Sequence, residues 1–429
     1  MSDDLRQRLE RLRRLGVQRG TAHLHPPEAR PRAPLVPFPS PGPYPLESLV
    51  PGRVTETPSG VCYVAEETHL IGERRGHRAL AECLAHPAQT VARLDRDPSL
   101  AAFDFRRAAF VDTETTGLES GTGNYPFLIG IGTFAGEAFV IRQYFMRNPS
   151  EEAAVLHLVT EQLDGRRPLV TFNGRAFDLP LLATRFALAR QRPPFAGAPH
   201  LDLLLPSRRL WRERLASRSL SDLEKEILGH WRTQADIPGW LIPQIYMTYV
   251  HTGDGRELAR VFYHNAEDIL SMVALAAHLC DSFAGPAARL HAGEAASLGR
   301  WYEEVGDWAA AEAAYRRALA GNLPDSLRRQ IYLRLSLLLK RQERREEARA
   351  LWETWITSLP SDDLTPYVEL AKHYEWRDTD LNAARMWTQW ALHTARAWPP
   401  SPARTLALAE LEHRLERLER KIDRWHNRS

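Results

Sequence analysis

Two acidic residues, Asp112 and Glu114, are separated by one residue at the end of a short apolar run, just before the turn residue Gly117. Alternate side chains of a β-strand point to the same face of a sheet, so we expect these two carboxylates to lie side by side. Two like charges held together repel each other, and the arrangement is costly unless a cation neutralises it. Carboxylate oxygens are the ligands that Mg²⁺ and Mn²⁺ prefer. The pair therefore predicts half of a divalent-metal site.

A second acidic element begins with the apolar residues 169–172, which predict a strand. The turn pair Asn173-Gly174 follows, and then Asp178 precedes an apolar-periodic stretch over 179–188 that predicts a helix. Asp178 is thus a candidate ligand, placed where a strand gives way to a helix. A simpler interpretation makes it an ordinary N-cap of that helix.

The third acidic element contains His264 and Asp268, four residues apart in a stretch that stays apolar-periodic to residue 279. A helix places such a pair on one face, one residue above the other. The alternative is an acidic first turn that only complements the helix dipole.

These three elements, in the order strand, loop-to-helix and helix, resemble the motifs of the DEDD superfamily of 3′–5′ exonucleases, whose members share an RNase H-like fold. The resemblance implies that Asp112, Glu114, Asp178 and Asp268 bind two divalent ions, Mg²⁺ or Mn²⁺. It also implies a two-metal-ion phosphodiesterase, a nuclease that hydrolyses phosphodiester bonds of DNA or RNA from the 3′ end. The bacterial YprB-like RNase H-like proteins resemble the chain over a longer stretch. Their spacing is matched by His200-Leu201-Asp202, Leu223-Glu224 and Asp236-Ile237-Pro238-Gly239.

The general base is open between two neighbours. Tyrosine-type members of the superfamily carry the base four residues before the last aspartate, and histidine-type members carry it five before. Here His264 stands at four and Tyr263 at five, so the residue types are exchanged. We favour His264, because helical spacing brings it over Asp268 and an imidazole suits proton transfer near neutral pH.

Four residues are candidates for substrate binding: Thr115, Asn173, Gly174 and Arg175. Glycine leaves room for a nucleotide to approach the backbone, although an Asn-Gly pair can equally be only a tight turn. Arginine binds phosphate through two hydrogen bonds, although a single arginine is as often a solvated surface charge.

Length and composition place limits on the remainder. A chain of 429 residues, 44% of them hydrophobic, has room for two or three domains. Its formal net charge of +2 gives no global field for nucleic acid. Three widely spaced cysteines form no disulfide framework. We find no apolar run of about 18 residues and no signal peptide, so we expect a cytoplasmic protein with no membrane partner.

Four segments are expected along the chain. Residues 1–51 hold a short helix and a proline-rich linker. Residues 52–99 form a small β appendage, and residues 100–285 form an RNase H-like domain with strands near 127–134 and 137–144 and a helix over 150–163. Residues 286–429 form helical repeats. The predicted fold is therefore an α/β RNase H-like mixed sheet flanked by helices, followed by an all-α repeat domain.

The predicted repeats rest on three alanines, Ala311, Ala348 and Ala384, spaced 37 and 36 residues apart. This spacing resembles the period of tetratricopeptide repeats, in which a small residue lets two helices cross closely. A final helix over residues 402–425 would cap the array. Such a module offers a surface to nucleic acid or to a protein partner, or else only supports the nuclease-like domain. The alternative to an enzyme is therefore a catalytically weak nucleic-acid-binding or scaffold protein that acts through its repeats.

Overall fold

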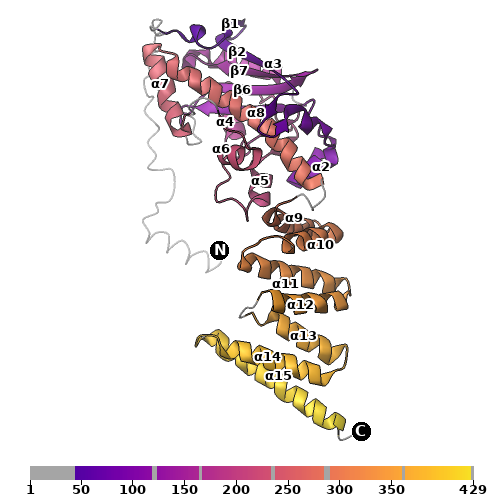
Figure 1. Cartoon of the computed structure of the whole chain (residues 1–429). Helices are drawn as coiled ribbons and strands as arrows, with labels where there is room; N and C mark the ends of the chain where they lie inside the picture. Colours follow the sequence, from indigo (N-terminus) through magenta and orange to yellow (C-terminus); the bar gives the residue numbers. More distant parts are fainter. Residues whose placement is uncertain are drawn as a thin grey trace, which may run out of the picture.

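The computed structural model describes residues 44–117, 123–163, 167–232, 237–284, 290–359 and 363–426. The helix predicted within residues 3–16 and most of the proline-rich linker lie outside these residues. The described chain has two parts, a sheet covered by helices and an arm of stacked helices that extends from it (Figure 1). Among the described residues, no helix is long and apolar enough to span a membrane.

The main sheet has seven strands in the order β1-β2-β7-β6-β5-β8-β9. β5 runs antiparallel to β6 and parallel to β8, so the sheet is mixed, as predicted. A separate two-stranded sheet joins β3 to β4. The strands are β1 (Gly52–Thr57), β2 (Gly60–Leu70), β3 (Arg74–Arg75), β4 (Arg78–Ala79), β5 (Ala109–Thr115), β6 (Pro126–Ala135), β7 (Ala138–Phe145), β8 (Leu169–Thr171) and β9 (His200–Asp202).

The first hairpin departs from the prediction of a separate appendage. β1 and β2 do pair with each other, but β2 also pairs with β7 from Tyr63 to Leu70 and so extends the main sheet. Pairing with β7 satisfies the backbone groups along the edge of β2 that does not face β1.

In the described part of the chain, helices α2 to α8 accompany the sheet, together with short 3₁₀ segments and one π-helical turn, and α9 follows them. They are α2 (Ala88–Asp95), α3 (Glu152–Gln162), α4 (Asp178–Leu188), α5 (Leu204–Leu210), α6 (Leu220–Leu223), α7 (Ile242–Thr252), α8 (Arg256–Ala284) and α9 (Ala292–Glu304), the last of which begins the arm. The predicted helices over 150–163, 179–188 and 264–279 are confirmed as α3, α4 and part of α8.

Helix α8 crosses one face of the sheet diagonally (Figure 1). It approaches β6 closely because Gly130 and Gly132 have no side chain there. A Cβ on Gly130 would lie 2.1 Å from Oδ1 of Asn265, and one on Gly132 would lie 2.6 Å from Cγ2 of Ile269. The two glycines of β6 thus set the distance between α8 and the strand that carries Asp112. The opposite face is buried under α3 and α4, where Val155 and Leu182 pack in one core with Val111.

The arm consists of consecutive helices that each pack on the next. After α9 these are α10 (Trp308–Leu319), α11 (Asp325–Arg341), α12 (Arg345–Ser358), α13 (Thr365–Trp376), α14 (Leu381–Arg396) and α15 (Pro402–His426). Ala311, Ala348 and Ala384 are fully buried, each as the fourth residue of its helix. The all-helical arm is confirmed, whereas its assignment to the tetratricopeptide class stays a prediction.

The arm is joined to the sheet domain by buried polar contacts as well as by a shared apolar core. Glu294 of α9 is buried and accepts hydrogen bonds from the Trp211 indole at 2.9 Å and from Arg214 at 2.6 Å. Tyr302 donates to the carbonyl of Phe283, at the end of α8, at 3.0 Å. These contacts fix the first helices of the arm against the domain.

Candidate functional site

Asp112 lies where β5 passes beneath α8. Its Oδ2 accepts a hydrogen bond from the amide of Asn265 at 2.8 Å, and Oδ1 of Asn265 accepts from the amide of Gln143 at 2.9 Å. Asp112, Gly130 and Gln143 are neighbours across three strands. Asn265 and Gln143 are buried, so this relay fixes both the Asp112 carboxylate and the rotation of α8.

Glu114 is two residues further along β5 and is only 8% exposed. Burial raises the pKa of Glu114 well above its ordinary value, and repulsion from Asp112 raises it further. Burial likewise raises the pKa of Asp112, with added repulsion from Asp268 and Asp178. In the described chain neither side chain forms an ion pair with an arginine or lysine. Burial and mutual repulsion disfavour the charged forms of both carboxyls, and a cation bound beside them would restore those forms.

Asp178 is the first residue of α4, and Phe177 occupies the N-cap position. The interpretation of Asp178 as an ordinary N-cap is therefore wrong. Its carboxylate instead accepts a hydrogen bond from the Thr113 hydroxyl of β5. Burial raises the pKa of Asp178 to about 6, against the lowering effect of the Thr113 hydrogen bond. The contact ties the second acidic element to the strand that carries the first.

His264 and Asp268 lie on one face of α8, with Nε2 of His264 3.5 Å from Oδ2 of Asp268. Both side chains contact Arg232, a residue that the sequence analysis did not identify. Arg232 donates to Oδ1 of Asp268, and its Nη1 lies 3.1 Å from Nδ1 of His264. A guanidinium can only donate hydrogen bonds, so Nδ1 of His264 accepts and the ring proton is on Nε2.

A buried glutamate anchors this arginine. Glu224, 1% exposed, accepts two hydrogen bonds from Arg232, at 2.7 and 3.0 Å. The side chain of Arg232 is itself only 6% exposed. Two negative charges and one imidazole thus surround a single cation at the α8 end of the site. Arg232 neutralises the charge of Asp268, whereas no arginine or lysine of the described chain pairs with Asp112 or Glu114.

The Asn173-Gly174 turn is held by a second aspartate that sequence reasoning left without a role. Asp202, buried at the end of β9, accepts from the backbone N–H groups of Asn173 at 2.8 Å and Arg175 at 3.0 Å. Asn173 has a positive φ of 68°. A Cβ on Gly174 would lie 2.5 Å from the Thr171 side chain, so glycine is required by the packing of the turn itself.

The remaining candidate residues are spread around this turn and the end of β5. Thr115 is buried and donates to the carbonyl of Gly117 at 2.7 Å. Asn173 is exposed, whereas Arg175 pairs with Asp95 at 2.7 Å. Tyr263 is half-buried on α8, next to His264. Thr115 and Arg175 therefore already have partners within the protein.

The donor set fits hard divalent cations, because it consists of carboxylate oxygens whose charge is buried and mutually repulsive. Among the described residues, the three ligand-type side chains whose donor atoms lie within 4.8 Å of one another are in the arm, not in this site. The four carboxylates thus lie near enough to repel one another, but in the described chain no three of them bring oxygens within 4.8 Å of one another. Asp268 already pairs with Arg232, whereas in the described chain Asp112, Glu114 and Asp178 form no ion pair with an arginine or lysine.

Residues 109–280 match the family model described as the RNase_H superfamily. This part of the chain is therefore a domain of the RNase H superfamily, in agreement with its mixed sheet and flanking helices. The chain is also similar to a protein of Bacillus subtilis (strain 168) named Uncharacterized protein YprB, with 34% identity over 279 residues. The match covers 64% of this chain and 66% of the relative, so the chain spans slightly less than two thirds of that relative's length.

Proposed function

We propose that this protein is a metal-dependent nuclease that hydrolyses phosphodiester bonds of DNA or RNA. The observation that carries the proposal is the buried, mutually repelling set of Asp112 and Glu114 on β5 and Asp178 at the start of α4. Burying such charge without a cation is destabilising, so its presence argues for a use. The finer reading, a 3′–5′ exonuclease with two Mg²⁺ or Mn²⁺ ions, draws on the resemblance to the DEDD superfamily.

Each side chain has a defined task in this proposal. Asp112, Glu114, Asp178 and Asp268 hold the ions, which when bound supply an activated water and neutralise charge at the phosphorus. Asn265 orients Asp112, and Thr113 orients Asp178. His264 accepts the proton of the attacking water. Asp202 fixes the backbone of the Asn173 turn, and in this proposal the exposed side chain of Asn173 contacts the nucleotide beside the scissile bond.

One observation favours a second candidate, a catalytically weak nucleic-acid-binding or scaffold protein. Arg232 holds both Asp268 and the accepting nitrogen of His264. In this arrangement the fourth carboxylate and the base are both engaged, so catalysis requires Arg232 to leave. A chain in which it never leaves would act through its repeats, with a nucleic acid or a protein as partner.

The test is digestion of 5′-labelled single-stranded DNA and RNA in the presence of Mn²⁺, with Asp112→Asn and Asp268→Asn beside the wild type. We expect shortened products from the wild type and none from either variant, with full activity in Arg424→Gln, an exposed charge change on α15. Equal product from all the proteins would place the activity elsewhere or in a contaminant. Tight binding of both nucleic acids without product would favour the scaffold.

A further inference from the structure

His373 occupies an unusual position in the arm. It lies near the end of α13 and is only 5% exposed. Its Nε2 atom is buried and has no hydrogen-bond partner among the described residues. A buried ring nitrogen without a partner is costly, because the desolvation of that atom is not repaid.

Two carboxylate oxygens face this nitrogen. Oε1 of Glu346, in the first turn of α12, lies 3.4 Å from Nε2 of His373, and Oδ1 of Asp378, just beyond α13, also lies 3.4 Å from it. All three donor atoms lie within 4.8 Å of one another. Among the described residues, Glu346, His373 and Asp378 are the group of metal-ligand side chains whose donor atoms approach this closely.

The two 3.4 Å separations match the edge of a metal coordination shell. Zinc binds imidazole nitrogen and carboxylate oxygen at about 2.0–2.2 Å, and in a tetrahedron the distance between two ligands is about 1.6 times the bond length. This gives about 3.2–3.5 Å between ligand atoms, a range that includes the observed separations. The same separation is too long for a good hydrogen bond from the ring to either oxygen.

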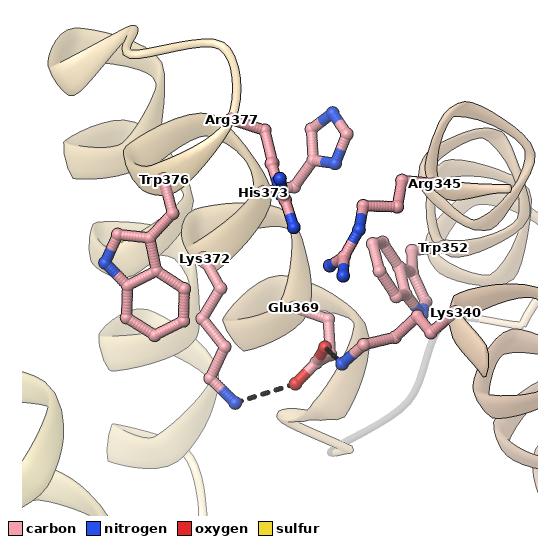
Figure 2. Close-up of a pocket in the computed structure, with 8 residues that line it drawn as sticks. All are labelled: Lys340, Arg345, Trp352, Glu369, Lys372, His373, Trp376 and Arg377. Atoms are coloured by element: carbon pink, nitrogen blue, oxygen red, sulfur yellow. Dashed lines mark hydrogen bonds and ion pairs between the residues drawn. The ribbon is translucent and has the colours of Figure 1, made fainter. Parts of the chain in front are cut away.

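The surroundings explain how the two carboxylates are held. Oε2 of Glu346, its other oxygen, pairs with Arg349 at 3.0 Å, which leaves Oε1 turned toward His373. Figure 2 shows the His373 ring bordering a pocket of about 330 Å³, on the same side as Arg345 and Arg377. Arg345 is itself paired with Glu343 at 2.8 Å.

These neighbouring cations bear on the choice of ion. Lys340 and Lys372, further along the pocket, both pair with Glu369, at 2.5 and 2.7 Å, so one net positive charge remains there (Figure 2). The positive charge of the arginines disfavours weakly held ions such as Mg²⁺ and Ca²⁺. It is overcome most readily by a transition-metal ion that bonds strongly to imidazole.

We infer that Glu346, His373 and Asp378 form a second metal site, which binds one transition-metal dication of the zinc type. Three protein ligands leave a fourth position open to water. Since Glu346 begins α12 and His373 and Asp378 lie at the end of α13, the ion would clamp two consecutive helices of the arm. The site is remote from the carboxylates of the RNase H-like domain and does not depend on the proposed nuclease activity.

The experiment titrates the full-length chain, freed of metal by chelation, with Co²⁺ and then with Zn²⁺. Co²⁺ absorption in the visible range reports tetrahedral coordination directly. We expect one Co²⁺ with tetrahedral absorption that Zn²⁺ displaces, together with a rise in the melting temperature of the arm. Asp378→Asn and Glu346→Gln should each weaken binding by about tenfold or more, because each removes a ligand.

Matched controls separate this site from others. Glu346 and Asp378 are exposed, so their variants test the site even if the buried His373→Gln does not fold. Glu410→Gln, at an exposed glutamate of α15, and Asp112→Asn should both keep the signal. The inference is overturned if the wild type shows no tetrahedral Co²⁺ absorption, or if Asp378→Asn and Glu346→Gln keep it unchanged. Either result would mean that His373 merely forms ion pairs with the two carboxylates.

Discussion

Replacing Arg232 by glutamine should make the RNase H-like domain bind divalent metal more tightly. Arg232 occupies Oδ1 of Asp268 and competes with a metal ion for that carboxylate. A hydrogen bond between charged groups contributes about 1.5–3 kcal/mol. Each 1.4 kcal/mol is a factor of ten in an equilibrium constant, so Arg232→Gln should raise metal affinity by roughly 10- to 100-fold.

The single variant leaves Glu224 buried without its cation, and that loss threatens the fold. The double variant Arg232→Gln/Glu224→Gln removes both charges and should keep the gain in affinity. The matched control is Arg185→Gln, because the side chain of Arg185 is also only 5% exposed and pairs with a different glutamate, Glu152. Its metal affinity should equal that of the wild type.

The assay is calorimetric titration of the full-length variants with Mn²⁺, counting only the binding that Asp112→Asn abolishes. The titration measures metal affinity rather than turnover, so the test is valid even if Arg232 also contributes to the reaction. Unchanged or weaker Mn²⁺ binding in both the single and the double variant would refute the competition between Arg232 and the metal. Arg232 would then be a structural partner of Glu224 and no more.

Three further predictions concern packing and charge. Gly130→Ala would place a Cβ 2.1 Å from Asn265, so α8 must shift, and we expect a loss of about 1–3 kcal/mol in denaturant unfolding together with weaker Mn²⁺ binding; unaltered stability would mean that the helix has room to move. Burial, and next the charge of Arg78, lowers the pKa of His278 to about 4. As pH falls, the His278 imidazole therefore takes up its proton in the unfolded chain before it does so in the folded chain. Stability should therefore fall between pH 6.5 and 4, by at most about 3 kcal/mol, and His278→Gln should flatten that part of the stability–pH curve; an unaltered slope would contradict this. The side chain of Glu375 is fully buried and pairs with three cations of α15, Arg414, Arg417 and Lys421. Glu375→Gln should therefore loosen α15 and lower the free energy of its local opening by about 3 kcal/mol. Amide hydrogen exchange in α15 should become faster, while α9 keeps its protection.

The local features of the site followed from the sequence because they depend on short-range geometry. A strand puts Asp112 and Glu114 on one face, and a helix puts His264 over Asp268, whatever the remainder of the chain does. The apolar runs that became β6, β7 and α4 were likewise sufficient to predict those elements. Ala311, Ala348 and Ala384 predicted helix crossings for the same reason, since only a small side chain fits there.

The features that the sequence did not predict depend on contacts between distant segments. Arg232 lies 36 residues before Asp268 in a stretch without periodicity, so no local pattern marks it as a partner. Asp202 and Asn265 were visible as polar residues, but their roles appear only when β9 meets the Asn173 turn and α8 meets β5. Pairing of β2 with β7 is equally non-local, which is why the first hairpin was expected to stand apart.

The most direct test of the central claim is anomalous diffraction from crystals of the full-length protein soaked in Mn²⁺. Our account predicts two peaks among Asp112, Glu114, Asp178 and Asp268, with the Arg232 side chain turned away from Asp268. Diffraction that shows no peak there, with Arg232 still bound to Asp268 at saturating Mn²⁺, would contradict it.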